Sequence, residues 1–236
     1  MVSGRDPGRS AECLMYSPET AVSTFHAFIQ DPKFPCVAAK SALATQGMRV
    51  VVGGDLRDGW ADAQLLSALR VTPNAPQSTA EFASTVILFP LTPPLAEIAF
   101  EHHLWALLQS LYDADRDEFD WPPDVSSDPR SANFAMSIGG TAYFIVGLHP
   151  GSSRMARRSP FAAVAFNPHS QFRRLKEDGL YERLRMVVRQ RDIALQGDAN
   201  PMLADHGEVS EAAQYSGRWV FAGWNCPFHP HLDTPL

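Results

Sequence analysis

Residues 147–160, GLHPGSSRMARRSP, gather side chains suited to binding an anion or a metal-bound anionic group. His149 stands before a proline, and three arginines follow it within five residues of one another: Arg154, Arg157 and Arg158. Guanidinium groups form strong, paired hydrogen bonds with carboxylates and phosphates. A neutral imidazole is a common metal ligand. The alternative is a buried histidine beside a turn with surface arginines, and the residues alone leave both interpretations open.

Residues 200–218 form a second stretch with chemical potential, because four ionisable residues lie within seven positions: Asp205, His206, Glu208 and Glu211. Carboxylates at this density suit a hard metal ion or a cationic, guanidinium-like substrate. A solvated, capped turn is the competing interpretation. Further hydrogen-bonding and aromatic groups follow at Gln214, Tyr215, Ser216, Arg218, Trp219 and Trp224.

Two more metal-ligand candidates stand in short, distinctive stretches. His169 lies in FNPHSQF, where an apolar run passes into a basic helical pattern, and Cys226 lies in NCPF. The chain's three cysteines are scattered and form no CxxC pair, which argues against a familiar zinc module or a disulfide framework. The sequence also lacks the GxSxG, Walker A, HExxH and strand-linked GxGxxG signatures of common enzyme classes.

The elements that would position these residues follow from local patterns. Ser17 is expected to cap a helix that has Pro18 in its first turn. The two central prolines at 93 and 94 open a long helix that ends near Tyr112, with an apolar stripe at Phe100, Leu104, Leu107, Leu108 and Leu111. A short helix is expected over 61–69. Strands are expected over 48–52, 84–89, 134–138, 141–146 and 161–166, with the third and fourth joined by Gly139-Gly140 as a hairpin.

A long basic amphipathic helix is expected over 170–195, loosened at Gly179, with a core face formed by Leu180, Leu184, Val187, Val188 and Leu195. His102 and His103 are expected to be structural or solvent-facing. The mixture of strands and helices predicts an α+β fold, a mixed or antiparallel sheet flanked by helices. Residues 1–16 are expected to be a mobile leader, and residues 17–236 a single domain.

Bulk properties limit the classes of function. The chain has 236 residues, is 45% hydrophobic and carries a formal net charge of −6, which argues for a globular protein and against a general nucleic-acid binder. The charge is uneven, since half of the 20 Lys and Arg residues lie between Arg154 and Arg191. No apolar run has the length of a membrane helix, and the N-terminal stretch MVSGRDPGRSAEC has no apolar core of signal-peptide length, so we expect a cytoplasmic protein without membrane contact.

The ordered combination of stretches resembles the YqcI/YcgG family. It consists of FPC (34–36), LWALLQSL (104–111), FAMSIGGTAYFIVG (134–147), LHPGSSRMARR (148–158), FNPHSQF (166–172), RQRD (189–192), NPMLADHGEVSEAAQYSGR (200–218) and WNCPF (224–228). The family includes heme-dependent N-hydroxylases of guanidine groups, one of which acts on arginine in the biosynthesis of the antibiotic D-cycloserine. The resemblance therefore implies a monooxygenase that converts L-arginine to Nω-hydroxy-L-arginine.

The resemblance also implies a heme b cofactor. His149 is the first candidate for its axial ligand, with His169 and then Cys226 as alternatives. The propionates would be held by the residues that follow His149 in the same stretch, namely Ser153, Arg154, Arg157 and Arg158.

The acidic stretch is then expected to hold the substrate. Asp205, Glu208, Glu211 and Arg218 would bind its charged groups, with Glu208, Glu211 and Tyr215 as catalytic residues that help remove a proton from the guanidinium group. O2 or peroxide would supply the oxygen, and a separate electron donor would be required. A non-catalytic heme carrier or gas sensor is the main alternative, and a metal-independent binding protein is a third.

Overall fold

One five-stranded mixed sheet organises the computed structural model, which describes residues 17–58, 63–70, 82–202, 209–221 and 223–231. Its strands are β1 (Met48–Val52), β2 (Ser84–Phe89), β3 (Met136–Ile138), β4 (Thr141–Leu148) and β5 (Ala162–Pro168). They lie in the order β1-β2-β5-β4-β3, with β1 and β2 parallel and every other neighbouring pair antiparallel. The α+β prediction and the mixed sheet are confirmed.

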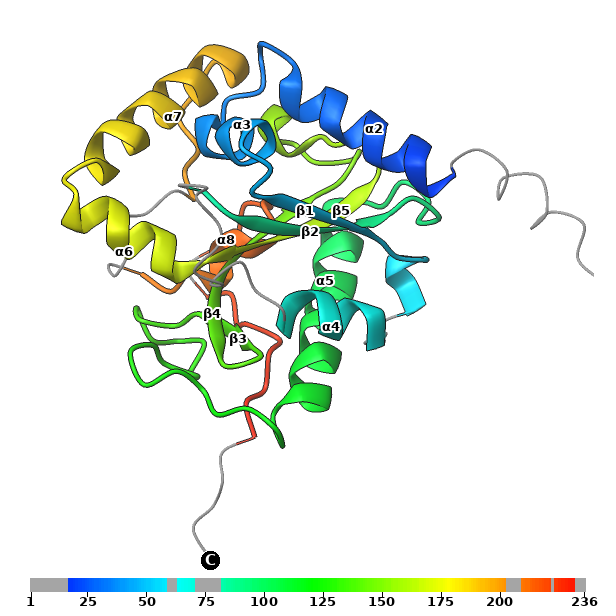
Figure 1. Ribbon diagram of the computed structural model, residues 1–236, viewed down its shortest axis with the longest axis vertical. Helices are drawn as coiled ribbons and strands as arrows, with labels where there is room; N and C mark the ends of the chain where they lie inside the picture. The colour runs from blue at the N-terminus through cyan, green and yellow to red at the C-terminus, as the bar shows by residue number, and fades with distance from the viewer. Residues whose placement is uncertain (1–16, 59–62, 71–81, 203–208, 222, 232–236) are drawn as a thin grey trace, which may run out of the picture.

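Helices cover both faces of this sheet (Figure 1). On one face, α2 (Pro18–Gln30) and α3 (Val37–Ala44) pack over alternate residues of the central strands, including Val86 and Leu88. On the other, α4 (Ala63–Arg70) and the long α5 (Glu97–Asp115) cover Ile87 and Phe89. Because β2 is buried on both faces, its residues read as a continuous apolar run and do not alternate.

The predicted helix starts and turns have the expected local causes. The Ser17 hydroxyl accepts a hydrogen bond from the Thr20 amide at the start of α2. Gly139 and Gly140, with φ of +59° and +65°, make the two-residue turn between β3 and β4. The stretch that begins at FPC, ambiguous in sequence, forms α3. The apolar stripe of α5 is buried as expected, at Phe100, Leu104, Leu107, Leu108 and Leu111.

The expected basic helix is two helices, α6 (His169–Glu177) and α7 (Tyr181–Gln196). Gly179 separates them in a left-handed conformation, with φ of +69°. The prediction of a core face in the second half is wrong for Leu180 and Val187, which are 42% and 36% exposed. Asp192 is the one buried residue of α7, so this helix lies on the outside of the domain.

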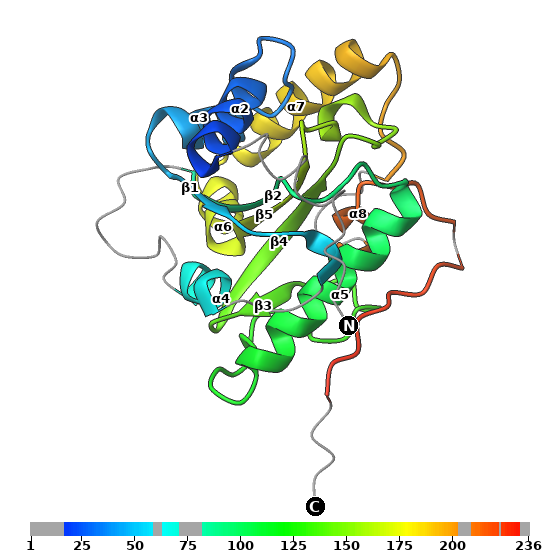
Figure 2. The ribbon, with the colours of Figure 1, turned by 90° about the vertical axis from the view of Figure 1, so that its right-hand side faces the viewer.

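The C-terminal segments 218–221 and 223–231 follow α5 along its length (Figure 2). Arg218 contacts Glu101 near the start of the helix, and Gln109 exchanges two hydrogen bonds with the backbone of His229 further along. The four-residue α8 (Ala212–Tyr215) precedes this segment and packs on β4. Over the residues with described structure, no helix combines the length and the apolar character needed to cross a membrane.

Candidate functional site

Strand register separates the two histidine candidates. His149 follows the last residue of β4, which pairs with Ala163, and His169 follows the last residue of β5, which pairs with Tyr143. The strands are antiparallel, so the histidines lie at opposite ends of the pair, about seven residues or ~20 Å apart. They therefore belong to two different sites, and one iron atom cannot be ligated by both.

His149 is a buried histidine whose ring nitrogens have no hydrogen-bond partner among the described residues. Its ring stacks on Phe100 of α5, with ring centroids 4.2 Å apart and an interplanar angle of 16°. Burial lowers the pKa of His149, against the opposing influence of the Glu97 carboxylate and the Leu95 carbonyl. The Leu95 carbonyl is near enough to affect the pKa, but it does not meet hydrogen-bond geometry with either ring nitrogen. His149 is thus a neutral imidazole with unused donor capacity.

The turn around His149 contains more unpaired polar atoms. The Ser152 hydroxyl and the Arg154 Nε are also buried without a partner in the described part of the chain. Gly151 lies against the Leu95 carbonyl, so that a Cβ there would come within 2.4 Å of that oxygen. Buried polar atoms are normally paired. Three such side chains within six residues leave this turn with hydrogen-bonding capacity that the described residues do not use.

The three arginines of the turn are used in different ways. Arg154 is buried and pairs with Asp192 of α7 (2.6 Å) and Asp198 (2.5 Å). Arg157 donates to the backbone carbonyls of Gly147, Gln214 and Tyr215.

The chemical consequences differ for each arginine. Burial lowers the pKa of Arg157 to about 10, with Asp192 acting in the opposite direction. Arg158 is exposed, and its Nε donates to the Ser152 carbonyl. Arg154 and Arg157 therefore brace the turn against its neighbours, and Arg158 is the guanidinium of the three that faces solvent.

Two acidic residues near His149 were missed by the sequence interpretation. Glu97, in the first turn of α5, accepts hydrogen bonds from the backbone amide and hydroxyl of Ser153. Glu101, one turn later, is buried and bonds both Ser216 and Arg218. The sequence did hold a sign that Glu101 is special: it lies three residues before Leu104, inside the apolar face of the helix. A charged side chain at such a position needs a partner.

The other end of the strand pair holds a closed polar network. His169 Nε2 lies 3.0 Å from Glu211 Oε2, and both side chains are buried. The Tyr215 hydroxyl donates to the Tyr143 carbonyl and accepts from the Met136 amide. Burial first, and then the Glu211 carboxylate, raise the pKa of Tyr215 well above its ordinary value. The structure therefore brings together Glu211, Tyr215 and His169, and it places their side-chain ends away from His149.

The remaining candidate site residues lie on the His149 side, in the core, or outside the described residues. Arg218 pairs with Glu101 at 2.5 Å, on the His149 side. Cys226 packs against the core beside α5, and burial raises the pKa of its thiol to about 12, which keeps it protonated at neutral pH. Asp205, His206 and Glu208 lie outside the described residues. Within the described ranges, no group of three His, Cys, Asp or Glu side chains is arranged to hold a metal ion.

The comparisons with known proteins agree with the ordered motifs. The model of the YqcI/YcgG family matches residues 25–229. The Bacillus subtilis (strain 168) protein named "Uncharacterized protein YcgG" is 30% identical over 181 residues, which cover 74% of this chain and 71% of that protein. "Uncharacterized protein YqcI" of the same organism is 27% identical over 160 residues, which cover 65% and 62% of the two chains. No solved structure matches the chain.

Proposed function

The chain belongs to the YqcI/YcgG family, and from this premise we propose that it is a heme-dependent N-oxygenase that hydroxylates a guanidine nitrogen, with L-arginine as substrate. The observation that carries the proposal is the burial of His149 without a hydrogen-bond partner among the described residues. A buried, neutral imidazole with both nitrogens unpaired among the described residues is the donor that heme iron takes from a protein. The ordinary alternative for such a residue, a hydrogen bond inside the core, is the arrangement found at His169.

The residues around His149 fit a heme group in two further respects. Stacking on Phe100 fixes the plane of the imidazole ring, which is how a protein holds a ligating nitrogen in one orientation. Arg158 presents an exposed guanidinium on the same turn, suited to a propionate carboxylate. Arg154 and Arg157 support the turn through their own partners, and Ser153 is held by Glu97.

Heme would supply the activation of O2, and the net reaction places one oxygen atom on the guanidine nitrogen while the second leaves as water, with two electrons and two protons consumed. The chain's own contribution is to bind the substrate cation and to accept its proton. Glu211 and the Tyr215 hydroxyl, which the sequence predicted as substrate-binding and catalytic groups, lie at the His169 end and away from His149, so they do not serve a heme held by His149. The proposed substrate set beside that heme is Arg218 with Asp205 and Glu208, and Glu208 is its proposed proton acceptor.

Two measurements on the purified full-length chain test the proposal. The first is the absorption spectrum after titration with hemin, for which we expect a saturable Soret band at one heme per chain. The second is incubation with L-arginine, O2 and a reductant, for which we expect arginine to gain one oxygen atom by mass spectrometry. Saturable heme binding with no oxidation of arginine or any other guanidine would favour the heme carrier or gas sensor. No specific heme binding would refute the proposal.

A further inference from the structure

Glu97, in the first turn of α5, ties this helix to the His149 turn. Its Oε1 atom accepts a hydrogen bond from the backbone amide of Ser153 at 2.9 Å and another from the Ser153 hydroxyl at 2.8 Å. Both bonds use the same oxygen, which leaves Oε2 without a partner in the described part of the chain. The carboxylate is therefore held beside the turn and keeps one oxygen for another interaction.

The Nδ1 edge of the His149 ring faces the same part of the molecule. A Cβ on Gly151 would stand 3.5 Å from His149 Nδ1 and 2.4 Å from the Leu95 carbonyl oxygen, so Nδ1, the Gly151 backbone and this carbonyl are neighbours. Leu95 lies two residues before Glu97, and Gly151 lies two residues before Ser153. The start of α5 and the backbone of the turn thus enclose Nδ1 and leave no space there for a porphyrin. Nε2 is the nitrogen that remains to ligate iron.

The strongest electrostatic influence on the His149 ring comes from a negative group. Burial lowers the pKa of His149, and the Glu97 carboxylate is the largest influence in the opposite direction. Arg157 acts in the same direction as burial, but its guanidinium is engaged by three backbone carbonyls. A carboxylate on one side of a ligating imidazole favours the tautomer with the proton on that side, and it makes the other nitrogen the more basic donor to the metal.

We propose that Glu97 is a positioning residue for the His149 ligand: its carboxylate holds the proton on Nδ1 and makes Nε2 the nitrogen that ligates the heme iron. The inference rests on the proposed function, because it assigns to Glu97 an effect on a heme held by His149. A more basic Nε2 stabilises ferric iron more than ferrous iron, since the ferric ion carries the greater positive charge. Glu97 therefore lowers the reduction potential of the heme, and its removal raises it.

The reduction potential of the hemin-loaded full-length chain measures this effect without turnover. Glu97→Gln removes the charge and keeps an oxygen for the two Ser153 donors, so the turn should stay in place. We expect this variant to shift the ferric–ferrous equilibrium toward ferrous iron by about tenfold, or about 59 mV for a one-electron couple. The iron–nitrogen stretching band of the ferrous heme, measured by resonance Raman spectroscopy, should move to lower frequency, because a less basic imidazole binds iron more weakly.

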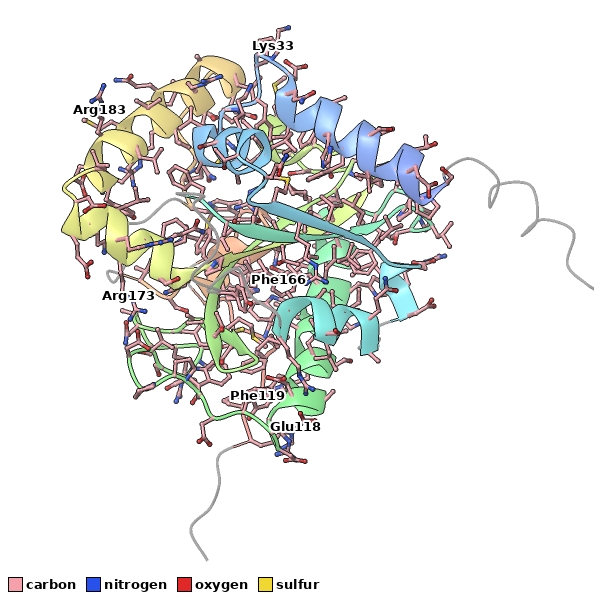
Figure 3. The ribbon with its side chains drawn as sticks, viewed as in Figure 1. Lys33, Glu118, Phe119, Phe166, Arg173 and Arg183 are labelled. Atoms are coloured by element: carbon pink, nitrogen blue, oxygen red, sulfur yellow. The ribbon has the colours of Figure 1, made fainter. Side chains whose placement is uncertain are left out.

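Glu118→Gln is the matched control, because it makes the same change just beyond the opposite end of α5 (Figure 3). Glu118 pairs with Arg70 at 3.0 Å. It lies about 30 Å along the helix axis from Glu97. This control should keep the wild-type potential and the wild-type iron–nitrogen band.

Three results would overturn the proposal. The first is an unchanged potential in Glu97→Gln, and the second is an equal rise in Glu118→Gln. The third is a raised potential with an unchanged iron–nitrogen band, since the carboxylate would then act on the heme directly and not through His149. A wild-type chain that binds no heme refutes the proposed function, whereas heme-loaded Glu97→Gln with the wild-type potential refutes this inference alone.

Discussion

His149 and His169 are two buried histidines that follow neighbouring strands of one sheet, and they have opposite chemical surroundings. His169 is paired with a buried carboxylate, Glu211. His149 is stacked on Phe100 and has no hydrogen bond from either ring nitrogen within the described structure. A buried histidine with a hydrogen-bond partner stabilises the fold, whereas one without a partner lowers the stability of the folded protein unless a ligand binds to it. The difference favours a structural role for the His169 end of the sheet, and it supports the ligand-binding role that we propose for the His149 end.

α8 connects these two ends. Glu211 precedes it at the His169 end, and the Tyr215 carbonyl at its last residue accepts from Arg157 at the His149 end. Gly147 of β4 lies so close to this segment that a Cβ would come within 2.9 Å of the Tyr215 carbonyl. A change at one end can therefore affect the other through α8, so the variants of Glu211 and His149, and those of His149 and His169, are compared with each other.

The largest expected loss of stability comes from removing the hydrogen-bond partner of His169. Glu211→Ala leaves His169 buried without its carboxylate and should lower the free energy of unfolding of the heme-free protein by about 3 kcal/mol. His149→Phe keeps the ring stack and removes two unpaired nitrogens, so its change should stay within about 1 kcal/mol. Urea denaturation at neutral pH measures both. Equal losses would mean that the two histidines are equally well satisfied, and the comparison would fail.

A smaller effect should distinguish the arginines of the His149 turn. Arg157→Met leaves three backbone carbonyls without their donor and should cost about 2 kcal/mol. Arg158→Met, at an exposed position, should change stability by less than about 0.5 kcal/mol. Urea denaturation at neutral pH measures the free energy of unfolding of both variants. If Arg158→Met were the more damaging of the two, the bracing role assigned to Arg157 would be wrong.

The smallest expected effect is a pH dependence that originates at His149. Its pKa in the folded protein is below the ordinary 6.5, so the unfolded chain binds the proton more readily. Stability is therefore unaffected by this group above pH 6.5 and declines as the pH falls below that value, by at most about 1.4 kcal/mol per pH unit.

Thermal unfolding of the heme-free protein across about pH 5 to 7.5 would detect this decline. His149→Phe should flatten it. His103, whose pKa is also lowered by partial burial, provides the control variant His103→Phe, which leaves the His149 contribution in place. A wild-type slope that persists unchanged in His149→Phe would assign the titration to another group.

Local patterns predicted most of the fold, because caps, alternation and turn glycines act over short distances. Ser17, the Gly139-Gly140 turn and the β2 run are examples. The core face predicted for the second half of the basic helix is wrong at Leu180 and Val187, because they have helical spacing but no element of the described structure covers them. The site was predicted as one cluster from adjacency in sequence. Strands β4 and β5 are antiparallel, so the predicted residues lie at two opposite ends of the sheet. This pairing depends on both strands and cannot be read from either one alone.

Ligand rescue decides whether His149 provides the axial nitrogen of a bound heme, as we propose. His149→Gly should bind hemin with an altered Soret band, and added imidazole should restore the wild-type spectrum by occupying the vacated space. His169→Gly, loaded in the same way, should keep the wild-type spectrum and show no response to imidazole. The claim is contradicted if His149→Gly gives an unchanged heme spectrum while His169→Gly loses it and is rescued.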